Sequence, residues 1–160
     1  MTRKTFIASV VLEGYQAILI PSKFGYSLAG TMDEDLIPQL KEDRRESLEW
    51  CKSKLKNPKR SSLNPEPWEK VSENKYKIKF SWNEEVKPKV VDTDCVEIKD
   101  TSLPLVPGCR VRVAFYQKPY ILKDGITYGT SFKSIGVQVV SLSEPSMLEL
   151  FGKIDGYKIG

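Results

Sequence analysis

The sequence predicts a mainly β domain, an antiparallel barrel or sandwich with one α-helix packed against it. Short runs of β-branched and aromatic residues recur along most of the chain, with glycines and prolines between them. One segment, at about 35–56, instead repeats its apolar residues every three or four positions, which is the period of a helix. The 160 residues are expected to form one domain, and a hydrophobic content of 40% is enough for a packed core.

The N-terminal segment predicts one long, curved strand followed by its partner. Thr5–Leu12 is β-branched and apolar, and after an interruption at Gly14 the run resumes over Tyr15–Ile20. Pro21 is expected to end it, because proline has no N–H to donate to a neighbouring strand. Phe24–Met32 is a weaker third run. A strand kinked at glycine suits a small barrel, whose strands must bend.

The helix predicted at about 35–56 has suitable charges at both ends. Carboxylates crowd its start and lysines crowd its end, as the helix dipole favours, and Pro38 is tolerated in the first turn. The connector that follows, 57–68, contains three prolines and is predicted to be irregular and mobile. For its Lys59 and Arg60 we favour a solvated loop over contact with an anion. The residues of the helical stripe are Ile37, Leu40, Arg44, Leu48, Cys51 and Leu55.

The remaining chain predicts short strands separated by turns. Lys75–Trp82 alternates cleanly, with aromatic and apolar residues on one face and lysines on the other. Pro88–Ile98 is a strand with a turn at Asp92–Asp94, and Arg110–Phe115 alternates after a Pro-Gly turn. A Val-rich return strand, Ser134–Leu142, closes the unit.

The composition argues against an enzyme and against a metal or cofactor site. The chain has no histidine, which is the commonest general base and metal ligand. Its three cysteines form no CxxC pair, and this pattern suggests a reducing cytoplasm. The paired carboxylates Asp92 and Asp94 are interpreted as a turn, and the acidic cluster at 33–35 as a helix start. No signal peptide and no membrane helix are predicted, and the net charge of +4 permits a nucleic-acid partner without requiring one.

Two rows of cations form the best candidate surface. Lys75, Lys77 and Lys79 share one strand face, and Arg110 and Arg112 form a shorter row. For one row alone we favour an ordinary solvated face, because edge lysines also prevent aggregation. Two rows without an interleaved carboxylate make anion binding an equally good interpretation. A linear row of cations matches the regular charges of a phosphate backbone.

The segment 116–128 is predicted to be a loop between the last two strands that interleaves aromatic and basic residues. Such a mixture suits single-stranded nucleic acid, because rings stack on bases at about 1–3 kcal/mol each while cations hold the phosphates. The alternative is a long hairpin loop whose tyrosines fold back onto the barrel rim. Trp82, at the end of its strand, is expected to reach the barrel mouth. The loop residues concerned are Tyr116, Lys118, Tyr120, Lys123 and Tyr128.

The order of these motifs resembles the single-stranded DNA-binding proteins of short-tailed, T-odd-type phages (podoviruses) and their marine relatives, the cyanophages. The matching stretches are YKIKF at 76–80, PKVVDTD at 88–94, and the long closing pattern of 106–142. The resemblance covers nearly the whole chain. It implies an OB fold, an antiparallel five-stranded barrel with one inserted amphipathic α-helix, over 1–145, and a short C-terminal tail at 146–160.

The resemblance also implies a function: sequence-independent binding of single-stranded DNA (ssDNA) in phage DNA replication, recombination and repair, in the host cytoplasm and without enzymatic activity. It implies contacts with the phage DNA polymerase and helicase-primase, and a homodimer. By position, it carries the DNA backbone contacts onto Lys77, Lys79 and segment 116–128. The family's best-known member ends in a long acidic tail that recruits these partners, whereas the last twenty residues here hold three carboxylates and two lysines. The resemblance therefore does not extend to recruiting partners or dimerising through an acidic tail.

Two other functions remain open at this point. The same barrel is an alternative interaction module of a replication complex, which binds an acidic protein and meets polyanions only incidentally. A metal-dependent nuclease would need the Asp92–Asp94 turn to hold Mg²⁺. For the leading hypothesis, the predicted DNA-contacting residues are Lys75, Lys77, Lys79, Trp82, Arg110, Arg112, Tyr116, Lys118, Tyr120, Lys123 and Tyr128.

Overall fold

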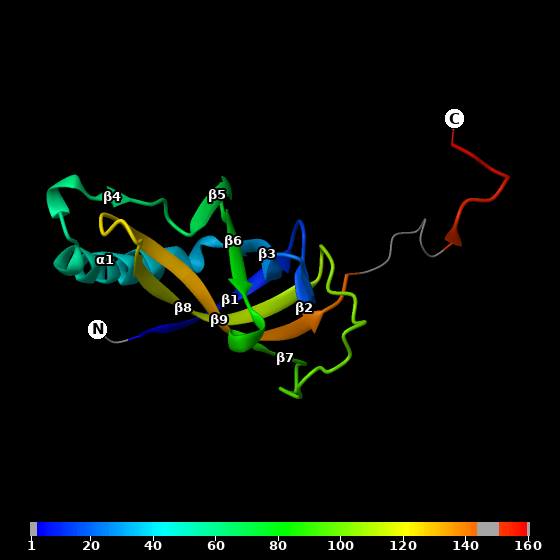
Figure 1. Ribbon diagram of the computed structural model, residues 1–160. Coiled ribbons are helices and arrows are strands. Elements are labelled where there is room, and N and C mark those ends of the chain that lie inside the picture. Colours follow the sequence, from blue (N-terminus) through cyan, green and yellow to red (C-terminus); the bar gives the residue numbers. More distant parts are fainter. Residues whose placement is uncertain (1–2, 144–150, 160) are drawn as a thin grey trace.

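The structure is a computed structural model that describes residues 3–143 and 151–159 (Figure 1). The predicted boundary between domain and tail, at 145–146, lies outside the described residues. Over the described residues the chain is mainly β with one α-helix, as predicted. The elements run in the order β1 (Thr5–Leu12), β2 (Ala17–Ser22), β3 (Gly25–Asp33), η1 (Glu34–Leu36), α1 (Ile37–Lys54), η2 (Pro58–Arg60), β4 (Ser62–Leu63), β5 (Trp68–Ser72), β6 (Lys75–Trp82), η3 (Glu84–Val86), β7 (Lys89–Val91), β8 (Arg110–Ile121) and β9 (Thr127–Ser141).

The strands pair in a ring. β1 lies between β3 and β8, β3 pairs with β6, and β8 pairs with β9, all antiparallel. β6 continues through η3 into β7, which pairs with β9 in parallel and so returns the path to β8. The sheet is therefore mixed and, over the described residues, has nine strands where five antiparallel ones were expected. The additional strands are short pieces that extend or edge the ring.

β1 and β2 form one strand interrupted by a bulge, since both pair with β3. Gly14 adopts a φ of +77°, which favours glycine, and the kink predicted there is confirmed. The side chain of Gln16 bonds to the backbone of Ala29 at the bulge. Its amide nitrogen donates to the Ala29 carbonyl at 2.6 Å, and the Ala29 N–H donates to its Oε1 at 2.9 Å. Pro21 lies inside β2 and does not end it, because β2 pairs on one side only.

Helix α1 confirms the predicted helical stripe. It runs over Ile37–Lys54 and buries Ile37, Leu40, Arg44 and Cys51, while Pro38 lies in the first turn. The acidic residues before it form η1, where the Asp33 carboxylate accepts a hydrogen bond from the Asp35 N–H at 3.1 Å. α1 packs against β8 and β9, along the part of their hairpin that extends beyond the other strands (Figure 1).

The connector after α1 has more structure than was predicted. Ser62–Leu63 forms β4, which pairs in parallel with the start of β9. Trp68, at the predicted end of the connector, begins the edge strand β5, which pairs with β6 and was not predicted. Trp68 is buried, and its ring stacks on Phe132 with 6.0 Å between the centroids. Local composition gave no alternation from which to predict these short edge strands.

The core lies inside the ring of strands and is centred on four phenylalanines. The rings of Phe115 and Phe132 are 4.7 Å apart, and Phe80 lies 5.3 Å from Phe115. Phe6 joins the cluster from β1. The alternation predicted for Lys75–Trp82 is confirmed, because its apolar side chains face this core and its lysines face out.

The predicted aromatic and basic loop of 116–128 is wrong. β8 continues to Ile121 and β9 begins at Thr127, so that only residues 122–126 form the turn. The ladder is continuous from Tyr116 opposite Lys133 to Ile121 opposite Tyr128. There are two physical reasons. α1 covers the far half of the hairpin, and the Asp124 carboxylate stabilises the short turn by accepting hydrogen bonds from the Ile126 and Thr127 N–H groups at 2.9 and 2.8 Å.

Candidate nucleic-acid interface

The two predicted basic rows lie on the same outer face of the sheet. Lys77 is opposite Thr31, Thr31 is opposite Val11, and Val11 is opposite Arg110. This single line across β6, β3, β1 and β8 corresponds to three strand spacings of about 4.8 Å each. The lysine row and the arginine row therefore flank a strip of sheet about 14 Å wide.

A shallow hollow of about 290 Å³ lies on this strip. Lys75, Arg110 and Arg112 line it together with small side chains of β1 and β3, and Asp33 adds one carboxylate. All three cations are exposed, and the Arg112 guanidinium donates to the Gln138 side chain at 3.0 Å. The hollow thus collects cations from both predicted rows at one place.

A second hollow, of about 460 Å³, continues along the outer face of β6. It is lined by Lys77 and Lys79, by the exposed Tyr15 of the β1–β2 bulge and by Val71 of β5, with Glu13 as its carboxylate. Thr31 lines both hollows, so they lie next to each other on this face. The bulge therefore places an exposed ring beside the lysine row, which is the combination that ssDNA binding uses.

A third hollow, of about 520 Å³, lies where the end of β6 meets the β8–β9 hairpin. Ser81 lines it, two residues after Lys79 on the same strand face. Phe24, in the β2–β3 turn, is 88% exposed at its edge, and the Lys23 ammonium lies 5.0 Å from that ring. The opposite side is formed by Tyr116, Lys118 and Lys133, among other residues. Rings and cations from three distant segments of the chain thus face one cavity.

A smaller hollow of about 140 Å³ shares Tyr116 and Lys118 with the third and reaches α1. Arg3 and Lys4 line it from the N-terminal side, and the Arg3 guanidinium lies 4.3 Å from the centre of the Tyr116 ring. We call these four hollows together the basic track. Its cations are Arg110, Arg112, Lys75, Lys77, Lys79, Lys118, Lys133, Arg3 and Lys4.

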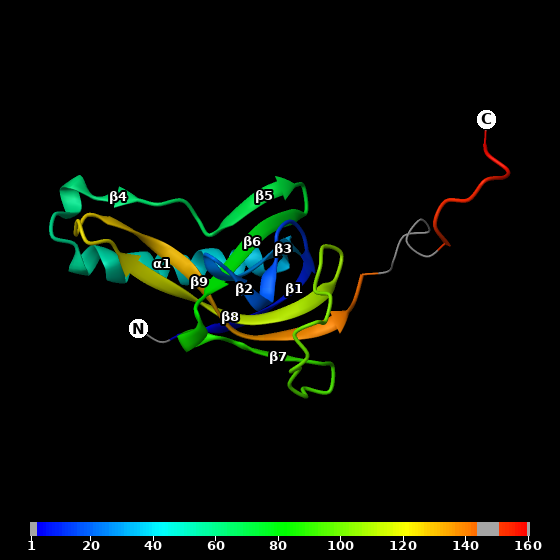
Figure 2. The ribbon, with the colours of Figure 1, turned by 45° about the vertical axis from the view of Figure 1, so that its right-hand side comes forward.

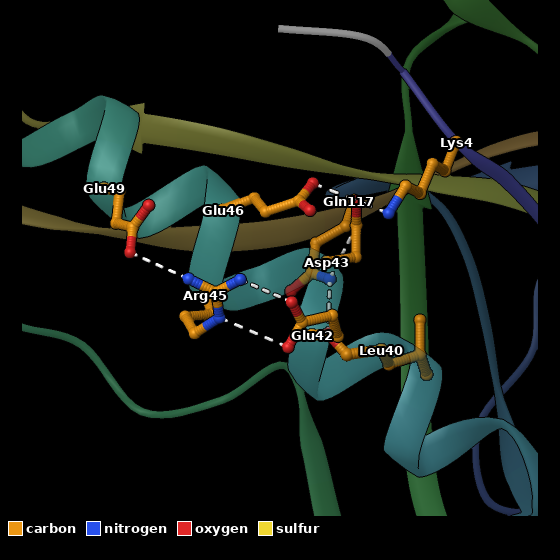
Figure 3. A network of polar contacts seen from close by, with 8 residues as sticks. All are labelled: Lys4, Leu40, Glu42, Asp43, Arg45, Glu46, Glu49 and Gln117. Atoms are coloured by element: carbon orange, nitrogen blue, oxygen red, sulfur yellow. Dashed lines mark hydrogen bonds and ion pairs between the residues drawn. The ribbon is translucent and has the colours of Figure 1, made fainter.

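The charges of the basic track are largely free. Over the described residues Lys4 is its one cation in an ion pair, at 3.5 Å from Glu46 (Figure 3). The other ion pairs are those of Arg45 with Glu42 and Glu49 on the outer face of α1, where Arg45 holds the pKa of Glu42 below its usual value. The basic track therefore presents positive charge that the protein itself does not neutralise, as an anion-binding surface requires.

Trp82, which was expected to reach the barrel mouth, is buried. It is 8% exposed and stacks on Tyr26 with 5.9 Å between the ring centres, so it forms part of the floor of the third hollow. The Tyr26 hydroxyl donates to the Glu84 carboxylate, and this hydrogen bond raises the pKa of Tyr26. Phe24, in the β2–β3 turn, lines the same hollow and supplies the exposed ring that was expected of Trp82.

Three predicted residues lie off the basic track. Tyr128 is 4% exposed and packs against Cys51 and other residues of α1. Tyr120 is half-buried, and its hydroxyl accepts a hydrogen bond from the Asn64 side chain at 2.8 Å. Lys123 is exposed in the hairpin turn. A strand that pairs its backbone and packs one face on a helix cannot serve as the mobile flap that was predicted.

Sequence reasoning missed Phe24, Tyr15 and Arg3. Phe24 had a usable signal, because it stands in a Lys-Phe-Gly turn between two strands, where a large apolar side chain has no core to enter. The sequence contains no such signal for Tyr15 or Arg3. Tyr15 joins the site through the β1–β2 bulge, and Arg3 joins it through its contact with Tyr116 on a neighbouring strand. Each becomes relevant only when strands far apart in sequence are brought together.

The carboxylates considered for metal binding have structural roles. Asp92 accepts hydrogen bonds from the N–H groups of Asp94 and Val96 at 2.8 and 3.0 Å, as expected for a turn. Within residues 3–143 and 151–159 no three His, Cys, Asp or Glu side chains gather where they would hold a metal ion. In the same part of the chain no helix is long and apolar enough to span a membrane.

Comparison with known proteins shows a likeness in fold. Neither the protein-family models nor the curated proteins match this sequence. Among solved structures, gp2.5, a single-stranded DNA-binding protein encoded by bacteriophage T7, matches with a TM-score of 0.69 and 16% identity, over 98% of this chain and 100% of that chain. This chain has the fold of a phage single-stranded DNA-binding protein.

A second phage protein shows the same fold. The C-terminally truncated single-stranded DNA-binding protein from bacteriophage Enc34 matches with a TM-score of 0.59 and 19% identity, over 93% of this chain and 88% of that one. The Enc34 protein in complex with ssDNA gives a TM-score of 0.57 and 17% identity, over 88% of both chains. The resemblance drawn from scattered sequence motifs is thus confirmed at the level of the fold.

Proposed function

We propose that this protein binds ssDNA along the basic track, without sequence preference, in phage DNA replication, recombination and repair. The observation that carries the proposal is the content of the basic track, whose hollows combine mostly unpaired cations with the exposed rings of Tyr15 and Phe24 and the half-exposed ring of Tyr116. Cations hold phosphates and rings stack on bases, and neither contact depends on which base is present. The two phage proteins of the same fold are both named for ssDNA binding.

We further propose that the ring of strands is an OB-fold barrel. Its five strands would be the bent β1–β2 strand, β3, β6–β7, β8 and β9, with α1 inserted between the second and third. OB folds bind oligonucleotides on the face of strands two and three. In this assignment that face is the outer face of β3 and β6, which carries Lys75, Lys77 and Lys79.

Binding of this kind requires no catalytic group, metal or cofactor, and we propose that the protein is not an enzyme. Contacts with the phage DNA polymerase and helicase-primase, a homodimer, and a location in the host cytoplasm stay predictions of the family resemblance. The assignment of individual DNA contacts, including those of Arg110 and Arg112, is likewise a proposal that rests on the geometry of the basic track.

A salt titration with oligo-dT tests the proposed function. If about five phosphates are neutralised, log K against log salt should have a slope of about −3.5, because each phosphate on a single strand contributes about −0.7. A flat salt response would refute binding along the basic track. The same titration with duplex DNA and RNA separates the alternative: strong preference for ssDNA supports the proposal, whereas indifference among polyanions supports a protein-interaction module.

A further inference from the structure

A second basic surface lies at the far end of the molecule, where α1 ends and the β8–β9 hairpin turns back. Three segments meet there, and both ribbon views show them side by side (Figures 1 and 2). We call this surface the distal cluster. Its six exposed cations are Lys52 and Lys54 in the last turn of α1, Lys56 just after it, Lys59 and Arg60 in η2, and Lys123 in the hairpin turn.

Backbone hydrogen bonds hold the three segments together. The Lys56 N–H donates to the Gly125 carbonyl at 3.1 Å, and the Ser62 N–H donates to the Ile126 carbonyl at 2.9 Å. The Lys56 side chain lies against Gly125, where any larger residue would meet it. These bonds therefore keep the backbones that carry the six cations next to one another.

The protein leaves this charge unneutralised. None of the six cations forms an ion pair within residues 3–143 and 151–159. The nearby Glu49 is paired with Arg45, and the Asp124 carboxylate is held by the Thr127 hydroxyl and the turn N–H groups, which lower its pKa. The negative end of a helix dipole amounts to about half a charge. The dipole therefore accounts for lysines on α1 but not for Lys59, Arg60 and Lys123.

The distal cluster lies beyond one end of the basic track. The track reaches Lys118 on β8, and Lys123 is five residues further along the same hairpin, about 16 Å away at the rise of a strand. Trp50, on the last turns of α1, is 41% exposed and adds a ring beside the cluster. A nucleic-acid strand that leaves the track at Lys118 need only follow the hairpin to meet a second group of cations.

We propose that the distal cluster is a second contact for the same ssDNA strand, which engages only strands long enough to pass Lys118. This inference rests on the proposed function, because it needs the basic track to bind the first part of the strand. Short oligonucleotides would then fill the basic track alone. Longer ones would add phosphate contacts, and their affinity would depend more steeply on salt.

The test compares oligo-dT of increasing length, from about 6 to about 40 nucleotides, which brackets the roughly 4–16 nucleotides that one OB fold covers. Native mass spectrometry selects the lengths at which one protein binds each strand. The variant Lys59→Glu/Arg60→Glu/Lys123→Glu reverses three exposed cations of the distal cluster. The triple variant Lys41→Glu/Lys99→Glu/Lys153→Glu makes the same change of net charge at exposed lysines elsewhere.

We expect the distal-cluster variant to match the control on short strands and to lose affinity on long ones. In the unchanged protein the salt slope should steepen by about 2 between short and long strands, if about three phosphates are added. Protection of Lys59 and Lys123 from acetylation by long strands alone would support the same conclusion without any variant.

Equal behaviour of both variants at every length overturns the inference and leaves the distal cluster to an acidic protein partner. Absence of binding by the unchanged protein to short strands would instead refute the proposed function.

Discussion

The two halves of strand β8 pack their inner side chains against different elements. In residues 110–116 the inner side chains enter the phenylalanine core, and the outer side chains of Arg110, Arg112 and Tyr116 line the basic track, as Lys118 does in the second half. In residues 117–121 the strand has left the ring, and α1 takes the place of the core. There Gln117 binds the Asp43 carboxylate and the Leu40 carbonyl of α1, at 3.0 and 3.2 Å (Figure 3). The comparison shows that the element covering a strand decides which inner side chains it carries: apolar ones against the core in the first half, and Gln117 bonded to α1 in the second.

A buried polar network, which the first half of β8 lacks, joins the second half to α1. The Thr130 hydroxyl donates to the Gln117 side chain at 2.7 Å, and Arg44 donates to Thr130 at 3.2 Å and to the Asn64 carbonyl at 2.9 Å. Buried polar groups of this kind are costly when one partner is removed. The network therefore fixes the hairpin and explains why its tyrosines cannot act as a flap.

The largest effect is expected from breaking this network. Arg44→Ala removes two hydrogen bonds and a buried aliphatic stem, and should lower the free energy of unfolding by about 2–4 kcal/mol. Arg45→Ala, the adjacent exposed arginine, removes surface ion pairs and should cost less than about 1 kcal/mol. Urea unfolding measures both variants. If both variants lost the same free energy of unfolding, the buried network would contribute no more than surface ion pairs to holding the second half of β8 on α1.

The next effect separates two tyrosines of the same strand. Tyr116→Leu should weaken oligo-dT binding by about 1–3 kcal/mol, because its half-exposed ring borders two hollows of the basic track. Tyr120→Leu should leave affinity unchanged and cost about 1 kcal/mol of stability, because its hydroxyl serves Asn64. Fluorescence titration and urea unfolding give the two values. A loss of oligo-dT affinity in Tyr120→Leu would support the original hypothesis that the whole of segment 116–128 contacts DNA.

A smaller effect concerns a single cation of the basic track. Lys77→Gln should make the slope of log K against log salt shallower by about 0.7, the contribution of one phosphate contact. Lys41→Gln, on the exposed face of α1, has the same charge change and should leave the slope as it is. Titrations at several salt concentrations measure this. If the two variants agree, the lysine row of β6 is a solvated sheet face, which was the alternative interpretation.

The smallest effect is a pH dependence in the network. Burial raises the pKa of Asp43 above its usual value, so the folded state favours the protonated carboxyl. The contribution of Asp43 to the free energy of unfolding is therefore at its maximum below the usual Asp pKa of about 4. It declines as the pH rises through the raised pKa of the folded state. Asp43→Asn should gain stability relative to the unchanged protein over that interval. Unfolding curves at a series of pH values give the difference, and a constant difference would show that the carboxyl is not desolvated.

Several elements could be predicted because their signals are local. Lys75–Trp82 alternates with period two, and its predicted bounds are those of β6. The helical stripe and Pro38 placed α1 to within two residues at each end. Gly14 marked the kink between β1 and β2. In each case the pattern of one short stretch decides its own conformation.

The candidate site was only partly predictable, because its parts come from distant segments. The lysine and arginine rows were found, yet Phe24, Tyr15 and Arg3 join the basic track only through strand pairing and a bulge. Segment 116–128 looked like a loop because lysine, glycine and proline interrupt it. Its pairing with β9 and its cover by α1 are long-range contacts, which a local pattern does not contain.

By itself the sequence determined the mainly β class, the position of the one helix and which side of β6 is basic. Those properties follow from the alternation and spacing of neighbouring residues, which bury apolar side chains in one direction only. The tertiary structure alone decided that the two basic rows lie on one face, that Phe24 faces Tyr116 across a hollow, and that Tyr128 is buried. These depend on the register between strands and on what covers them, and both are set by packing between residues far apart in the chain.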